Sequence, residues 1–143
     1  MPKLLIVSSQ IHETLSQRQL SLCEALVKQS SYDYEIEASN FGTYEIPFII
    51  NAYQQKTSFD GYLVLGLVLK ADLDHYHYLM SHIKDCFSTF ALKQIAVGNG
   101  IISGASIEEL THKIESAQPC ISGYLAAFNA VDYLIKLKRN LSL

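Results

Sequence analysis

The sequence is short of charge, of cysteine and of long apolar runs, and each shortage excludes a class of protein. Charged residues make up 17% of the 143 residues, and the formal net charge is −3. The single cationic cluster, Lys136, Lys138 and Arg139, suits a helix end that complements its own dipole, so we expect no nucleic-acid partner. The apolar run in "MPKLLIVSSQ" is too short for a signal peptide or a membrane span. We therefore expect a cytoplasmic protein that does not contact a membrane.

The cysteines are few and widely separated. There are 3 of them, at Cys23, Cys86 and Cys120, in apolar surroundings. Their spacing matches neither a disulfide framework nor a metal-binding motif. We expect buried thiols in a reducing compartment.

The remaining sequence alternates between strand and helix patterns. Hydrophobic residues make up 49% of the chain, enough for a real core, and we expect one domain over residues 1–143. Strands are predicted at 3–8, at 32–39 near a sheet edge, within 59–69 after a turn, and at 93–99. Helices are predicted at 12–29, from Pro47, at 76–90, after a Ser106–Glu109 capping box, and from Pro119 to the end. This order predicts a three-layer α/β sandwich with a four-stranded parallel sheet ordered 2-1-3-4.

Ligands bind such sheets beyond the carboxyl ends of the strands. Four segments fall there in the predicted fold: "SSQIHE", "NFGTYEIP", "KADLDHYH" and "GNGIISG". In the second, free backbone N–H groups and Glu45 could bind ligand hydroxyls, although a simple loop-to-helix junction explains the same residues. In the fourth, glycines could admit a flat ligand, but the lysine of a phosphate-binding loop is missing.

The third segment has three interpretations. His75 is a candidate for proton transfer, since the ordinary pKa of histidine is near neutrality. Alternatively, Asp74 caps a helix and the histidines lie on the surface. A metal site from Asp72, Asp74, His75 and His77 is disfavoured because residues two apart on a helix face different directions.

Taken together, these segments resemble the lumazine synthase family of riboflavin biosynthesis. "GTYEIP" is similar to the family's Gly-Ala-(Phe/Trp)-Glu-Ile-Pro. "LGLVLKADLDHYHY" is similar to its Leu-Gly-Cys-Val-Ile-Arg-Gly-Glu-Thr-x-His-(Phe/Tyr)-Asp-Tyr, and "IAVGNGIIS" matches a version of its fourth strand. The resemblance extends over nearly the whole chain, with the motifs in order and at matching spacing.

The resemblance implies a flavodoxin-like fold and one reaction. The family joins 5-amino-6-(ribitylamino)uracil to 3,4-dihydroxy-2-butanone 4-phosphate, releasing phosphate and water and forming 6,7-dimethyl-8-ribityllumazine, without a metal or cofactor. By position, His75 would transfer protons. The implied substrate contacts are Thr43, Tyr44 and Glu45 for the ribityl chain, Leu67, Val68, Leu69 and Asn99 for the uracil, and Asp72 and Leu73 for the butanone phosphate.

Most departures from the family pattern affect residues that would contact the butanone phosphate. Ile11 replaces an aromatic residue that stacks on the uracil. The phosphate contacts are changed more severely, because Leu73 replaces a threonine, Ser116 an arginine and Ser122 a lysine. Charged hydrogen bonds of this kind are each worth about 1.5–3 kcal/mol, so phosphate affinity could fall by about two to five powers of ten. Lys70, His12 and His77 are the cations and histidines that could compensate, while Asp74 adds a negative charge.

Three functional hypotheses follow. The first is an authentic lumazine synthase with a changed phosphate pocket. The second is a protein on the same scaffold that binds a pteridine- or flavin-like ring without turnover, and the third is an unrelated flavodoxin-like flavin binder. The family forms pentamers with sites shared between subunits. Because the first strand begins at about Lys3, without the segment that joins a neighbour's sheet, we expect a homo-oligomer of pentamer or decamer size and no sixty-subunit shell.

Overall fold

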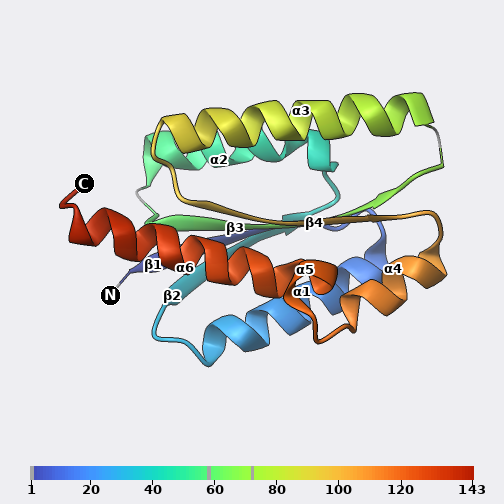
Figure 1. Ribbon diagram of the computed structural model, residues 1–143, viewed down its shortest axis with the longest axis horizontal. Coiled ribbons are helices and arrows are strands. Elements are labelled where there is room, and N and C mark those ends of the chain that lie inside the picture. The colour runs from blue at the N-terminus through green and yellow to red at the C-terminus, as the bar shows by residue number, and fades with distance from the viewer. Residues whose placement is uncertain (1, 58, 72) are drawn as a thin grey trace.

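Four parallel strands form the centre of the molecule and helices cover both faces (Figure 1). The computed structural model describes residues 2–57, 59–71 and 73–143, with Leu73 described by its backbone only. The strands are β1 (Lys3–Ser9), β2 (Asp33–Ser39), β3 (Gly61–Leu69) and β4 (Val97–Gly104). The helices are α1 (Glu13–Lys28), the 3-10 helix η1 (Thr43–Glu45), α2 (Ile46–Lys56), α3 (Leu73–Leu92), α4 (Ile107–Ile114), α5 (Pro119–Ser122) and α6 (Tyr124–Asn140).

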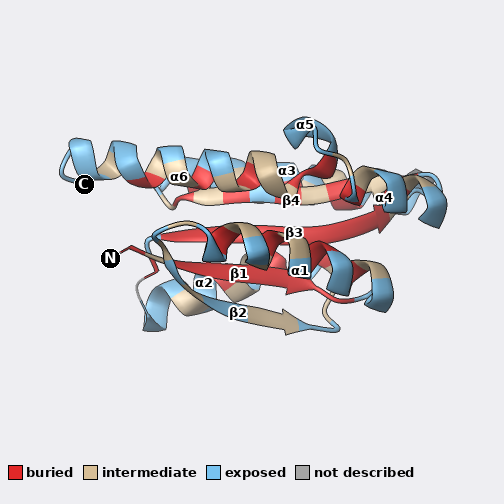
Figure 2. Cartoon of the chain, turned by 90° about the horizontal axis from the view of Figure 1, so that it is seen from below, coloured by how far each residue is buried: buried red, intermediate tan, exposed pale blue. Residues whose placement is uncertain are grey.

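The sheet order is β2-β1-β3-β4, and every pairing is parallel. The prediction of a three-layer sandwich with order 2-1-3-4 is therefore confirmed. Helices α2 and α3 cover one face, while α1 and α6 cover the other (Figure 1). The predicted edge strand is β2, which is more exposed than the central strands β1 and β3 (Figure 2).

Alternation along β1 and β3 divides the core between the two faces. Leu4 and Ile6 pack with residues of α1 and α6, whereas Leu5 and Val7 pack with residues of α2 and α3. Each fully buried aliphatic side chain of this size stabilises the fold by about 1.5–3 kcal/mol relative to exposure. This two-sided burial explains the continuous apolar runs of the central strands.

The fourth strand begins later than predicted, at Val97 instead of residue 93. Gln94 adopts a left-handed conformation (φ 59°), and the Ile95 N–H donates to the Phe90 carbonyl, so residues 93–95 form the turn after α3 and not the start of a strand. "GNGIISG", predicted as a ligand loop, lies within β4. A Cβ on Gly98 would lie 2.1 Å from the Ala127 carbonyl oxygen, so this glycine admits helix α6 where we expected a ligand.

Two helix predictions also need correction. Helix α3 begins at Leu73, three residues before the predicted start at Tyr76, so Asp74 and His75 belong to its first turn. The last helix is interrupted at Gly123, whose φ of +80° separates α5 from α6. A Cβ there would lie 2.6 Å from Ile102 Cγ2, so the turn packs directly on β4.

The expectation of buried thiols is confirmed for Cys23 but is wrong for Cys120. Cys23 is buried, and burial raises the pKa of its thiol to about 12. Cys86 is half-buried, and its pKa is also raised by burial. Cys120 is exposed, because the short helix α5 lies at the surface. In the described part of the chain, none of the helices is long and apolar enough to span a membrane.

Candidate active site

A cavity of about 550 Å³ lies at the carboxyl ends of β1 and β3, the position that the topology predicts for a ligand. Its walls come from the segment after β1, from η1, from the end of β3 and from the start of α3. The lining residues are Ser9, Ile11, His12, Gly42, Thr43, Tyr44, Glu45, Leu67, Val68, Leu69, Ala71, His75 and Leu79. Most of the predicted substrate-binding residues therefore line one cavity.

Thr43 anchors the wall formed by η1. Its side chain is buried, and a Cβ on Gly66 would lie 2.5 Å from Thr43 Cγ2. Gly66 thus allows η1 to pack closely against β3. Upstream, the Ser9 hydroxyl donates to the Phe41 carbonyl at 2.6 Å, which ties the loop before η1 to the end of β1.

Tyr44 and Glu45 follow on the exposed side of this wall. The Tyr44 ring stacks on His82 of α3, with ring centroids 3.8 Å apart and planes 16° apart. The Glu45 side chain turns back toward Gly42, where a Cβ would lie 2.8 Å from Glu45 Oε2. A carboxylate at this place can accept hydrogen bonds from ligand hydroxyls.

The opposite wall combines apolar side chains with one imidazole. Val68 packs with Leu79 toward α3, whereas Leu67 packs toward α4. His75 lies in the first turns of α3, exposed at the cavity surface. Ile11, 52% exposed, lies at the rim of the cavity near Gly42. The cavity therefore offers an apolar surface for a ring, a carboxylate for hydroxyls and an imidazole for proton transfer.

Comparison with known proteins identifies the family. The sequence model of the 6,7-dimethyl-8-ribityllumazine synthase family matches residues 1–138. The chain belongs to this family. It is 28% identical over 142 residues to the 6,7-dimethyl-8-ribityllumazine synthase of Bartonella tribocorum (strain CIP 105476 / IBS 506), covering 96% of this chain and 91% of the relative. The enzyme of Jannaschia sp. (strain CCS1) is 25% identical over 139 residues, covering 96% of this chain and 76% of the relative.

Membership in the lumazine synthase family assigns the chain to a family of oligomeric transferases of riboflavin biosynthesis. Identity to the relatives is low, at 22% over 138 residues for the protein of Erythrobacter litoralis (strain HTCC2594). The predicted site residues therefore need to be located one by one in this structure.

Two predicted contacts lie outside the cavity. Asn99 is exposed on the edge strand β4, where its Oδ1 accepts a hydrogen bond from the Ile101 N–H at 2.9 Å. It borders a separate hollow against α3 with Met80 and Lys84. Ser116 follows α4, and its hydroxyl oxygen accepts a hydrogen bond from the Gln118 N–H.

The predicted phosphate contacts are only partly described. Asp72 lies outside the described residues, and for Leu73 the structure gives only the start of α3. These two assignments stay predictions. The alternative metal site also depends on Asp72, and among the described residues no group of three or more His, Cys, Asp or Glu could hold a metal ion.

Sequence reasoning missed one cation near the sheet edge. Lys113 of α4 donates to the Ser103 carbonyl at 2.6 Å, and its Nζ lies 3.4 Å from Glu109. The pKa of Glu109 is lowered, chiefly by the Ala105 N–H and further by Lys113 and Lys70. The i,i+4 spacing of Glu109 and Lys113 on the predicted helix was the available signal.

Sequence reasoning also gave no role to several cavity-lining residues. These are Ser9, Gly42, Ala71 and Leu79, together with His12, which was considered only for the phosphate. Ser9, His12, Gly42 and Ala71 lie within the segments singled out in the sequence, and Leu79 directly follows one of them. That position was the only sign of their place in the cavity.

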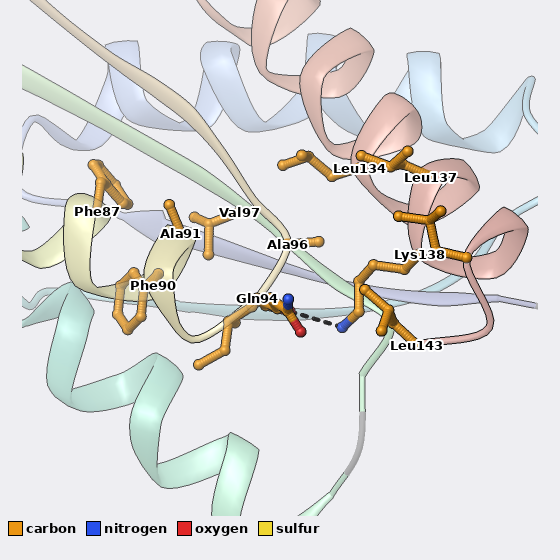
Figure 3. A pocket seen from close by; sticks show the side chains of 12 residues that line it. Phe87, Phe90, Ala91, Gln94, Ala96, Val97, Leu134, Leu137, Lys138 and Leu143 are labelled. Carbon is orange, nitrogen blue, oxygen red and sulfur yellow. Dashed lines mark hydrogen bonds between the residues drawn. The ribbon is translucent and has the colours of Figure 1, made fainter.

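A different hollow, of about 280 Å³, lies at the amino end of β4, between the ends of α3 and α6 (Figure 3). Phe87, Phe90 and Leu134 contribute apolar surface to it, and Lys138 donates to the Gln94 carbonyl oxygen at 2.8 Å. Among the described residues that line it there is no Asp, Glu or His side chain, unlike at the cavity of the carboxyl edge. We therefore assign the chemistry to the carboxyl-edge cavity.

Proposed function

We propose that this protein condenses 5-amino-6-(ribitylamino)uracil with 3,4-dihydroxy-2-butanone 4-phosphate to form 6,7-dimethyl-8-ribityllumazine. The observation that carries the proposal is the cavity of about 550 Å³, in which Thr43, Tyr44 and Glu45 lie on one wall and His75 on another. Family membership supports the same reaction.

The ring and ribityl chain of the uracil substrate suit different parts of this cavity. Leu67, Val68 and Leu69 offer an apolar surface for the ring, with Ile11 at the rim. An aliphatic Ile11 in place of an aromatic residue gives up a stacking contact worth about 1 kcal/mol. The ribityl hydroxyls would bind the Glu45 carboxylate and the backbone of η1.

His75 would move protons during condensation. The substrate amine attacks the ketone carbonyl and water leaves, so protons must be taken from nitrogen and delivered to oxygen. Loss of phosphate from the terminal carbon then needs a proton to be removed from the carbon next to it. Attack of the ribitylamino nitrogen on the carbonyl formed there closes the ring with loss of a second water. An imidazole is suited to these proton transfers at neutral pH.

Lys70 is the cation that we propose for the phosphate group. It directly follows β3, and its Nζ lies 5.2 Å from the centroid of the Tyr76 ring. A lysine offers a point charge and does not reproduce the two-pronged hydrogen bonding of a guanidinium. We therefore expect weak binding of the butanone phosphate relative to the uracil.

We further propose that residues 1–143 act as one domain within a pentamer or decamer, with sites shared between subunits. The exposure of Asn99 on an edge strand, outside the cavity of its own chain, supports this arrangement. Asn99 would then reach the cavity of a neighbouring subunit.

The test is a lumazine-formation assay on the purified oligomer, with His75→Ala and the matched control His112→Ala. His112 is exposed on α4, away from the cavity lining. We expect turnover by the wild type, a fall of about 10²–10⁴-fold for His75→Ala, and an unchanged control. An intact oligomer without turnover would reject the reaction, and binding of the lumazine product by that oligomer would favour the ring-binding alternative.

A further inference from the structure

His82 of α3 makes a contact with the cavity wall that the proposed reaction does not use. Its ring stacks on Tyr44, with centroids 3.8 Å apart, and its Nε2 lies 3.1 Å from the Tyr44 carbonyl oxygen. A carbonyl oxygen can only accept, so Nε2 carries the hydrogen and donates. Two interactions of different kinds thus join α3 to the middle residue of η1.

The Tyr44 carbonyl needs a donor from outside its own helix. In a 3-10 helix the N–H three residues later donates to each carbonyl. For Tyr44 that residue is Pro47, which has no N–H. His82 supplies the hydrogen bond that the local sequence cannot make.

A thiol lies next to the same imidazole. Cys86 follows His82 by one helical turn, and its Sγ is 3.7 Å from both His82 Nδ1 and His82 Nε2. Burial raises the pKa of Cys86. The thiol does not distinguish the two nitrogens, so the contact with the Tyr44 carbonyl alone assigns the hydrogen to Nε2.

Other contacts hold the two ends of η1, whereas Tyr44 in its middle is held by His82. Thr43 is held by burial against β3, and the Glu45 N–H donates to the Gly42 carbonyl. Gly42, which precedes η1, provides no side-chain cap. Tyr44 itself is 56% exposed, and its ring packs against an imidazole on a different element.

We propose that His82 is a positioning residue, which holds η1 in the conformation that binds the uracil substrate. It does so through Tyr44, so that Glu45 stays at the cavity. This inference rests on the proposed function for its kinetic test, but the conformational part can be measured without substrate.

The kinetic test compares substitutions that remove one interaction at a time. His82→Phe keeps a stacked ring without the hydrogen bond, His82→Gln keeps an N–H donor without the ring, and His82→Ala removes both. We expect His82→Ala to raise KM for 5-amino-6-(ribitylamino)uracil about tenfold, with smaller increases for the other two and little change in kcat. KM for the butanone phosphate should stay constant, because the proposed function assigns η1 to the other substrate.

The conformational test measures amide hydrogen exchange in the peptide covering residues 41–47 of the oligomer. We expect faster exchange in His82→Ala than in the wild type, partial protection in His82→Phe and His82→Gln, and wild-type exchange in His112→Ala. Unchanged exchange in folded His82→Ala would overturn the inference. If the wild type shows no turnover, the proposed reaction fails, and the exchange result still decides the role of His82.

Discussion

Gly66 is the residue on which the shape of the cavity wall depends most directly. A Cβ at this position would lie 2.5 Å from Thr43 Cγ2, well inside normal contact distance. Because Thr43 begins η1, any displacement of Thr43 also moves Tyr44 and Glu45. We therefore expect a side chain at residue 66 to weaken ligand binding in two ways, by crowding Thr43 and by displacing Tyr44 and Glu45.

Gly66→Ala should destabilise the protein by about 1–3 kcal/mol through overpacking and weaken binding of 6,7-dimethyl-8-ribityllumazine. Adding Thr43→Ser removes the methyl group that the new Cβ would strike, so the double variant should recover part of both losses. Denaturant unfolding and fluorescence titration measure the two effects. A double variant no better than Gly66→Ala would refute the proposed contact.

At the scale of elements, strand β4 depends on its close approach to helix α6. A Cβ on Gly98 would lie 2.1 Å from the Ala127 carbonyl oxygen and 2.8 Å from the carbonyl carbon. Both atoms belong to the backbone of α6, so no side-chain rotation relieves the collision. The two elements would have to separate.

Gly98→Ala should therefore lower the free energy of unfolding by about 3 kcal/mol, at the upper end of the range for overpacking. Gly42→Ala is the matched control for stability, because its Cβ would meet mainly the end of the flexible Glu45 side chain. Urea titrations of both variants should give a much larger decrease for Gly98→Ala. Equal decreases would contradict the close packing of β4 on α6.

The capping box at α4 should make stability depend on pH. The Glu109 N–H donates to Ser106 Oγ, and the Glu109 carboxylate accepts from the Ala105 N–H. This second bond is the main reason why the pKa of Glu109 is lowered from 4.5. A lowered folded-state pKa stabilises the protein above pH 4.5, and the contribution disappears as the pH falls through the lowered value.

Thermal unfolding between pH 7 and pH 3 measures this dependence. Glu109→Gln keeps an acceptor oxygen without the charge, so its Tm should fall less steeply over the acid range than that of the wild type. Glu108→Gln, an exposed neighbour in the same turn, is the control and should follow the wild type. If the Tm of Glu109→Gln falls with pH as steeply as that of the wild type, the ionisation of Glu109 is not linked to folding.

The elements also show what the sequence could predict. The apolar runs of β1 and β3 and the Ser106–Glu109 cap depend on local pattern, and the sheet order followed from the alternation of strands and helices. The continuation of β4 from residue 99 to Gly104 could not be predicted this way, because glycine in a loop and glycine under a helix look the same in sequence. Contacts such as Tyr44 on His82 join residues 38 positions apart and leave no local signal.

At the scale of the whole molecule, the site should be completed by a second subunit. Asn99 is exposed on the edge of the sheet, while every described residue that lines the cavity of the same chain falls between Ser9 and Leu79. All of these lining residues precede β4, which leaves β4 available to a neighbour.

Co-expression of His75→Ala and Asn99→Arg subunits tests this arrangement. Each variant alone should have little activity, because every site in its oligomer carries one defect. In mixed oligomers some sites combine an intact His75 with an intact Asn99 from the neighbour, so lumazine formation should partly return. Activity no higher than the average of the two parents would place both residues in the same subunit's site or exclude Asn99 from it.

The most direct test of the central claim is the electron density of crystals soaked with 6,7-dimethyl-8-ribityllumazine. We expect density in the cavity of about 550 Å³, with the ring along Leu67–Leu69 and the ribityl chain toward Glu45. Density in the apolar hollow between α3 and α6, or an empty cavity at saturating ligand, would contradict the assignment of this cavity as the site of lumazine formation.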